Sequence, residues 1–134
     1  MVRQPIKGVL AWSLPGGVAE QGESLLEALK REIEEESGVL IHDQVDPAYE
    51  IEMLDEQGSC SASIHAFSVH AQRAEILIND PDKHIVEAAW VPMNEAIEKL
   101  TEVPIAMMRD PAIAYLREGK HFCWKYDSEG SKQI

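Results

Sequence analysis

The stretch that decides the fold runs from Gly17 to Val39 and reads Gly-Val-Ala-Glu-Gln-Gly-Glu-Ser-Leu-Leu-Glu-Ala-Leu-Lys-Arg-Glu-Ile-Glu-Glu-Glu-Ser-Gly-Val. Apolar residues recur at helical spacing after Ser24, which can form a capping box with Glu27 three residues later. Gly38 stands where a left-handed C-terminal cap is expected. The stretch therefore predicts a helix over about Ser24 to Ser37.

Three acids share one face of this helix near its end. Glu32, Glu35 and Glu36 are spaced i, i+3, i+4, so their side chains meet. Like charges at this spacing destabilise a helix by about 0.2–0.5 kcal/mol per pair, and the helix dipole disfavours each anion in the last turn by about 0.3–1 kcal/mol. A divalent cation would reverse both effects, because hard cations take carboxylate oxygens. The alternative for a Glu-rich helix is an ordinary solvated acidic face.

The residues around the helix complete a longer pattern. Gly17 is followed after five residues by Glu23, after seven more by Arg31-Glu32, and then by Ile33, Glu35-Glu36, Gly38 and Val39. This pattern resembles a complete Nudix box, and the preceding Trp12-Ser13-Leu14-Pro15-Gly16 is similar to the lead-in of that family. Seven fixed residues at about 7% background each match by chance roughly once in 10⁸ placements. The resemblance covers Trp12 to Val39, and the rest of the chain matches only loosely.

The resemblance implies both a fold and a reaction. The implied fold is α/β, a Nudix-type α/β/α sandwich with a mixed sheet, which we expect residues 1–134 to form as a single domain. The implied reaction is the hydrolysis of a nucleoside diphosphate linked to another moiety. Glu35 and Glu36 are then the main ligands of Mg²⁺ or Mn²⁺, Glu32 is a further ligand or the general base, and the Gly16 carbonyl is another ligand. Such a site suits phosphoanhydride hydrolysis, which needs a positioned water and neutralised phosphate charge.

The same resemblance gives supporting roles to four other positions. Glu23, at the entrance of the helix, completes the outer part of the metal site. Arg31 holds Glu23 or the preceding loop by a charge-assisted bond and so positions the catalytic acids Glu32 and Glu35. Gly17 and Gly38 serve the tight turn and the helix cap.

Three further candidates for substrate binding lie outside the box. Arg3 lies where the family often keeps a basic residue that contacts phosphate, although a solvated surface arginine is the alternative. Many relatives place an acid six residues before the tryptophan, a position that His84 occupies here. We expect Glu87 to substitute for it, ahead of Asp80 and Asp82, so Arg3, Glu87 and His84 are the candidate substrate-side residues.

The remaining elements follow from local patterns. The N-terminal strand region looks shortened, because Val2–Gln4 can only end a strand, Pro5–Ala11 reads as a loop and a short strand follows at Ala11–Leu14. A sheet edge left open there would be covered by a second subunit, so we expect a homodimer. Further strands are expected at Tyr49–Leu54, Ser59–Ala71, Arg73–Ile78 and Phe122–Tyr126, helices at Asn94–Leu100 with Asn94 as N-cap and at Pro111–Glu118, and a frayed C-terminus.

Composition bounds the possible partners and the compartment. The formal net charge of −12 argues against a nucleic-acid backbone or an anionic membrane as the main partner. No apolar run approaches the roughly 18 residues of a membrane span, and no secretory signal is visible. Cys60 and Cys123 lie far apart in sequence and fit a reducing compartment, so we expect a cytoplasmic protein.

The residues after the box bear on the class of substrate. Pro47 and Tyr49 come too early for the marks that ADP-ribose hydrolases and dinucleoside polyphosphate hydrolases carry after the box. The layout is similar to small Nudix proteins acting on nucleoside di- and triphosphates, which we take as the expected small-molecule substrates. Nucleotide sugars, ADP-ribose, dinucleoside polyphosphates, a nucleotide-sensing domain without activity and a poorly active truncated product remain alternatives.

Overall fold

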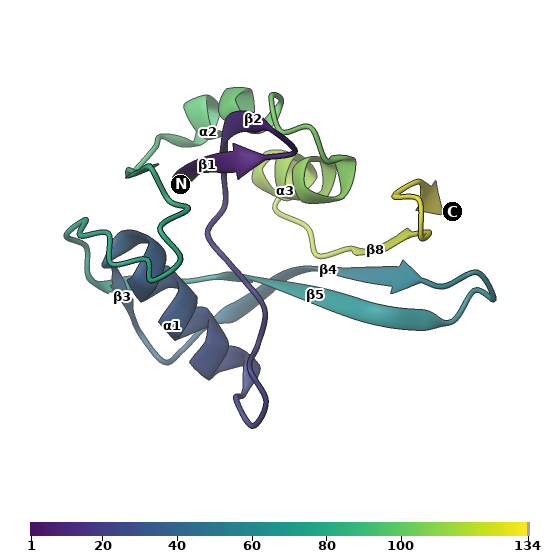
Figure 1. Cartoon of the computed structure of the whole chain (residues 1–134), viewed down its shortest axis with the longest axis horizontal. Coiled ribbons are helices and arrows are strands. Elements are labelled where there is room, and N and C mark those ends of the chain that lie inside the picture. The colour runs from purple at the N-terminus through teal and green to yellow at the C-terminus, as the bar shows by residue number, and fades with distance from the viewer. Residues whose placement is uncertain (134) are drawn as a thin grey trace.

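The structure is a computed structural model that describes residues 1–133 (Figure 1). Its helices are α1 (Leu25–Ser37), α2 (Met93–Leu100) and α3 (Ala106–Glu118). Its strands are β1 (Val2–Ile6), β2 (Val9–Ser13), β3 (Leu40–Ile41), β4 (Asp46–Leu54), β5 (Cys60–Ser68), β6 (Ala71–Arg73), β7 (Glu87–Ala88), β8 (Cys123–Tyr126) and β9 (Lys132–Gln133). No helix within residues 1–133 is both long and apolar enough to cross a bilayer.

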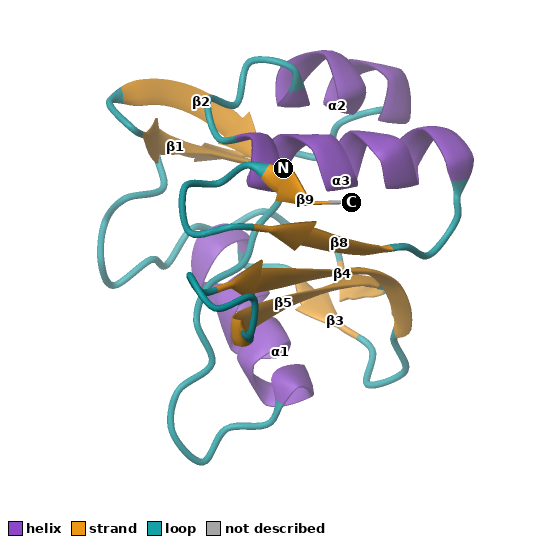
Figure 2. Ribbon diagram, turned by 90° about the vertical axis from the view of Figure 1, so that its right-hand side faces the viewer, coloured by secondary structure: helices purple, strands orange, loops and turns teal. Residues whose placement is uncertain are grey.

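The strands form three sheets, ordered β2-β1-β7, β3-β6 and β5-β4-β8-β9. The pairing of β4 with β8 is parallel and the other pairings are antiparallel, so the strand arrangement is mixed. Figure 2 shows α1 on one side of β4 and β5, with α2 and α3 on the other side. The expected α/β fold with helices on both faces is confirmed.

Two apolar clusters hold these layers together. One joins Ile33 of α1 to Val39 and Ile41 at β3, so it fixes the C-terminal half of the helix. The larger cluster draws on β1, β2, β4, α2, α3 and β8, and its members include Ile6 near the N-terminus and Tyr126 near the C-terminus. Burial of apolar area at about 25 cal/mol per Å² is the main force that keeps these elements in place.

The N-terminal region differs from the sequence expectation. Pro5 and Ile6 continue β1, and a two-residue turn at Lys7-Gly8 leads directly into β2. Both turn residues have positive φ, 48° for Lys7 and 77° for Gly8, as a tight hairpin turn requires. β1 pairs with β2 on one side and β7 on the other, so the expected loop at Pro5–Ala11 is wrong.

Both later helices begin elsewhere than expected. α2 starts after Pro92, and Asn94 lies inside it without a capping bond. α3 starts at Ala106, five residues before Pro111, which was expected to open it. Pro111 cannot donate the helical hydrogen bond of that position, but it is fully buried, and packing offsets the lost bond.

The segment after β6 is not a strand, although the pattern at Arg73–Ile78 predicted one. The long strand expected at Ser59–Ala71 is likewise divided into β5 and β6. Beyond β6 the backbone turns to the end of α1 instead, where Leu77 N–H donates to Ser37 O (2.7 Å) and Asn79 N–H to Glu35 O (2.9 Å). These bonds satisfy carbonyls that a helix end leaves without intrahelical partners.

The C-terminus is also more ordered in form than expected. Lys132 and Gln133 form β9 against β8, and Asp127 accepts two backbone N–H bonds in the turn between them. The expected fraying is therefore wrong for these residues, and Ile134 lies outside the described part of the chain.

Candidate active site

Helix α1 carries the site, and both of its ends form as the sequence predicts. Ser24 Oγ accepts the Glu27 N–H at 3.1 Å, and Glu27 Oε2 accepts the Ser24 N–H at 3.4 Å, which is a complete capping box. Gly38 caps the other end in the left-handed conformation, with φ 79°. The last two turns of the capped helix lie against Pro15-Gly16-Gly17. The tight turn expected at these three residues is wrong, because the structure has neither a turn nor a bend there and turns instead at Gln21-Gly22.

Glu36 is the most buried acid of the group. Its side chain leaves only 6% of the residue exposed, and Glu36 Oε2 accepts the Gly16 N–H at 2.9 Å. Burial raises the pKa of Glu36 to about 7, and the charges of Glu32, Asp80 and Glu35 add to that rise against the lowering effect of the Gly16 N–H. A carboxylate held under these conditions lacks a positive partner.

Glu32 lies directly against Gly17. A Cβ built on Gly17 would stand 2.2 Å from Glu32 Oε1, whereas a Cβ on Gly16 would meet nothing within 4 Å. Only a glycine at position 17 therefore leaves room for the Glu32 carboxylate. Glu32 and Glu36 thus contact the adjacent residues Gly17 and Gly16.

Arg31 joins the acids to the loop before the helix. Its Nε and Nη2 donate to both Glu23 oxygens at 2.7 and 3.0 Å, and Nη2 also donates to Val18 O at 3.2 Å. Its Nη1 lies 3.0 Å from Glu32 Oε1 and 3.4 Å from Glu35 Oε2. The hydrogen bond from Arg31 holds the pKa of Glu23 down at about 2, so Glu23 is a permanent anion that fixes the guanidinium.

Asp80 is the acid from outside the helix that joins this group. The loop that bonds to the end of α1 brings it there, since its charge acts on Glu36. Asp80 Oδ2 accepts the N–H groups of His84 (2.6 Å) and Ile85 (3.1 Å), and Oδ1 accepts that of Asp82 (3.2 Å). Although partial burial raises the pKa of Asp80, these three donors bring it below its ordinary value.

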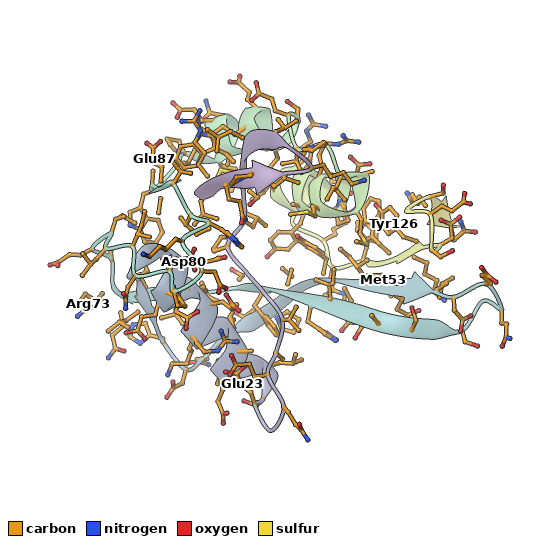
Figure 3. The ribbon with its side chains drawn as sticks, in the orientation of Figure 1. Glu23, Met53, Arg73, Asp80, Glu87 and Tyr126 are labelled. Carbon is orange, nitrogen blue, oxygen red and sulfur yellow. The ribbon has the colours of Figure 1, made fainter. Side chains whose placement is uncertain are left out.

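The first-ranked downstream acid lies elsewhere. Glu87 is in β7, where its Oε2 lies 3.7 Å from Arg3 Nη1, so these two candidates neutralise each other across the β1–β7 pairing. Figure 3 shows Asp80 beside α1 and Glu87 farther from that helix. The sequence ranked Glu87 ahead of Asp80, but the contacts of these two residues favour Asp80 as the downstream acid, and the His84 N–H donates to Asp80. The Asn-Asp-Pro-Asp loop was the available signal, because aspartate in such loops commonly accepts nearby backbone N–H groups.

The donor set fits a hard divalent cation. Glu32, Glu35, Glu36 and Asp80 supply carboxylate oxygens, the ligands that Mg²⁺ and Mn²⁺ prefer. Within the described residues no three such side chains already stand close enough to hold an ion, and the Arg31 guanidinium lies between Glu32 and Glu35. The crowded charge at Glu36 and the open space beside Gly16 nevertheless mark the point on which the carboxylates can close.

Comparison with known proteins decides the family. A model of the NUDIX domain matches residues 1–110 of this chain. The chain belongs to the Nudix family. The matched range contains α1, Gly16-Gly17 and the loop around Asp80, so the family expected from the Gly17–Val39 pattern is confirmed.

One known sequence and one solved structure are similar to this Nudix domain. It is 29% identical over 98 residues to Nudix hydrolase 6 of Arabidopsis thaliana, an alignment that covers 69% of the chain and 32% of the relative, so the chain spans about a third of that protein's length. The crystal structure of the mMutator MutT protein from Bacillus halodurans matches 99% of the chain and 86% of its own length, with a TM-score of 0.59 and 23% identity. The second likeness shows the fold.

Proposed function

We propose that this Nudix domain hydrolyses a phosphoanhydride bond in a nucleoside diphosphate linked to another moiety, and that nucleoside di- or triphosphates are its substrates. The observation that supports this most is the buried Glu36, which accepts the Gly16 N–H and lies among other carboxylates. A fold selected only for stability would not gather like charges there. A bound Mg²⁺ or Mn²⁺ would neutralise phosphate charge and lower the pKa of a bound water.

The roles of the residues follow from their positions. Glu35 and Glu36 would hold the cation with the Gly16 carbonyl, and Asp80 is placed to add a further oxygen. Glu32, beside Gly17, would accept the proton of the attacking water as the water oxygen bonds to phosphorus and the bridging phosphate oxygen departs. Arg31 and Glu23 are positioning residues, since they make contact with the acids and the loop alone.

Gly16 and Gly17 offer a matched pair of variants. Gly17→Ala places a methyl group where the Glu32 carboxylate lies, and this flexible side chain will move away while the fold is kept. We expect a fall in kcat of about 10²-fold, because displacing a catalytic group by about 1 Å has that effect. Gly16→Ala has open space and is expected to keep activity within about threefold. Equal losses in the two variants would contradict the placement of Glu32.

Arg31→Lys tests the positioning role. A lysine is a point charge and cannot reproduce the fork that holds Glu23, Val18 O and two catalytic acids at once. We expect kcat to fall by about 10- to 100-fold with KM little changed, since a positioning role for Arg31 includes no bond to the substrate. Lys30→Ala, which removes only an exposed pair with Asp43, is the control. A rise in KM at constant kcat would argue that Arg31 binds substrate.

A panel of nucleotides tested with Mg²⁺ and Mn²⁺ checks the substrate class. Phosphate or pyrophosphate release from nucleoside di- or triphosphates, abolished by EDTA, is the expected result. Preference for nucleotide sugars, ADP-ribose or dinucleoside polyphosphates would move the proposal to that class. Binding without turnover in calorimetry, for every nucleotide tried, would instead support a sensing domain.

A further inference from the structure

The outer edge of β5 is a feature that the proposed reaction leaves unused. β5 is the end strand of the sheet ordered β5-β4-β8-β9, so it pairs with β4 on one side only. It is nine residues long, and Cys60 to Ile64 are exposed. Figure 1 shows the β4–β5 hairpin projecting from the helices. Unpaired N–H and C=O groups along such an edge form a template for another strand.

The usual protections of an open edge are largely missing here. Charged side chains, proline, bulges and short length keep natural edges from pairing. The β5 sequence Cys-Ser-Ala-Ser-Ile-His-Ala-Phe-Ser contains no Asp, Glu, Lys, Arg or Pro. Its register with β4 shifts only near the two ends and is regular from Ala62 to Ala66. By comparison, β2 is five residues long with α2 packed beside it, and β9 has two residues.

We infer that the edge pairs with a second copy of this chain, antiparallel and about a two-fold axis at Ile64. This register places Ile64 opposite Ile64, Ser63 opposite His65 and Ala62 opposite Ala66 of the second copy. Apolar groups then meet on one face, and a hydroxyl meets an imidazole on the other. These two groups already suit each other within one copy, where Ser63 Oγ lies 3.2 Å from His65 Nε2.

Isologous pairing also avoids opposing like charges in the strand itself. On the neighbouring strand β4, Glu52 Oε2 lies 3.6 Å from Lys125 Nζ, and Glu50 Oε1 lies 3.6 Å from His65 Nδ1. Because β5 itself carries no Asp, Glu, Lys or Arg, the paired strand needs no counter-charge from another protein, which favours a second copy over a basic peptide. It lies on a different sheet edge from the N-terminal one where the sequence had led us to expect a dimer contact.

The net charge gives the inference a distinctive signature. Two copies that each carry −12 repel one another, while the paired strand is uncharged. Screening shortens the Debye length from about 10 Å at 0.1 M salt to about 3 Å at 1 M. Association through β5 should therefore tighten as salt is added, by about 10-fold over that range, whereas an interface made of ion pairs would weaken.

Sedimentation equilibrium on the full chain tests the inference. We expect a salt-strengthened dimer for the wild type, a monomer for Ile64→Lys, and an unchanged dimer for Leu10→Lys. Leu10 is the matched control, because it is 45% exposed on the outer strand β2 and Ile64 is 40% exposed. A wild type that stays monomeric at about 100 μM at every salt concentration, or an Ile64→Lys variant that still dimerises, would overturn the inference.

A covalent readout keeps the test decisive if Ile64→Lys folds poorly. In a background with Cys60→Ser and Cys123→Ser, Ile64→Cys places two thiols at the axis, about 5 Å apart between Cβ atoms. Air oxidation should then yield a disulfide-linked dimer, with O₂ as the electron acceptor, while Leu10→Cys in the same background stays monomeric. Equal crosslinking in both variants, or none in either, would overturn the register. Nucleotide hydrolysis does not enter this test, so its outcome is independent of the proposed function.

Discussion

Replacing Glu36 with glutamine is expected to lower metal-dependent nucleotide hydrolysis by about 10³-fold while the fold is kept. Glutamine can still accept the Gly16 N–H, so the segment around Gly16 stays in place against α1. It cannot supply the negative charge that a divalent ion needs, and loss of one such electrostatic contact is typically equivalent to about 3–4 kcal/mol in the transition state. Initial rates at saturating Mg²⁺ measure the loss, and Glu34→Gln, on the exposed side of the same helix, is the control.

The same substitution is expected to stabilise the protein when no metal is present. The pKa of Glu36 rises from 4.5 when unfolded to about 7 in the fold, so ionisation of this group destabilises the native state. Stability contributed by the protonated form is therefore full below pH 4.5 and is lost as the pH rises through about 7, to the extent of roughly 3 kcal/mol.

Urea unfolding in EDTA checks this sign. Glu36→Gln should match the wild type near pH 5 and exceed it near pH 8, while Glu34→Gln should follow the wild type at both. Added Mg²⁺ should stabilise the wild type and leave the Glu36→Gln variant unchanged. A constant difference between the two curves at all pH values would contradict the account of Glu36.

Gly38→Ala is expected to cause the largest loss of stability. The position has φ 79°, and an added Cβ would lie 2.3 Å from Leu77 O and 2.5 Å from Leu77 N. Because the obstacle is backbone, it can move only if the segment releases the end of α1. Left-handed strain alone is about 1–2 kcal/mol, and with the clash we expect about 4 kcal/mol in the free energy of unfolding.

Gly119→Ala provides the comparison that separates strain from crowding. Gly119 also caps a helix in the left-handed conformation, with φ 66°, but a Cβ there meets nothing within 4 Å. Its replacement should therefore lower stability by only about 1–2 kcal/mol. Equal destabilisation of the two variants in urea would mean that Leu77 does not pass over Gly38 as described.

The parts that the sequence predicts well are those whose signals are local. Ser24, Glu27 and Gly38 determine both ends of α1 through bonds made within a few residues of each position. Helical spacing places Glu32 and Glu36 on one face of α1, and the structure shows that this face meets Gly16 and Gly17. The two caps and the i, i+4 spacing are local signals, so the sequence is sufficient to predict the bounds of α1 and the face that these two acids share.

The remaining parts depend on contacts that no local pattern contains. Asp80 lies near the end of α1 because the backbone of Leu77 and Asn79 bonds to that end instead of to a neighbouring strand. Pro111 lies within α3 because core packing outweighs a rule that usually places proline at the first turn. The Lys7-Gly8 turn did carry a local signal, glycine after a possible strand, and the shortness of the segment concealed it.

Mn²⁺ binding in the absence of nucleotide, followed by electron paramagnetic resonance, tests directly whether the carboxylates of α1 hold a metal ion. The account predicts saturable binding to the wild type and to Glu34→Gln, and at least about 10-fold weaker binding to Glu36→Gln. No binding by the wild type at about millimolar Mn²⁺, or equal binding by Glu36→Gln, would contradict the claim that these carboxylates gather to hold a metal ion.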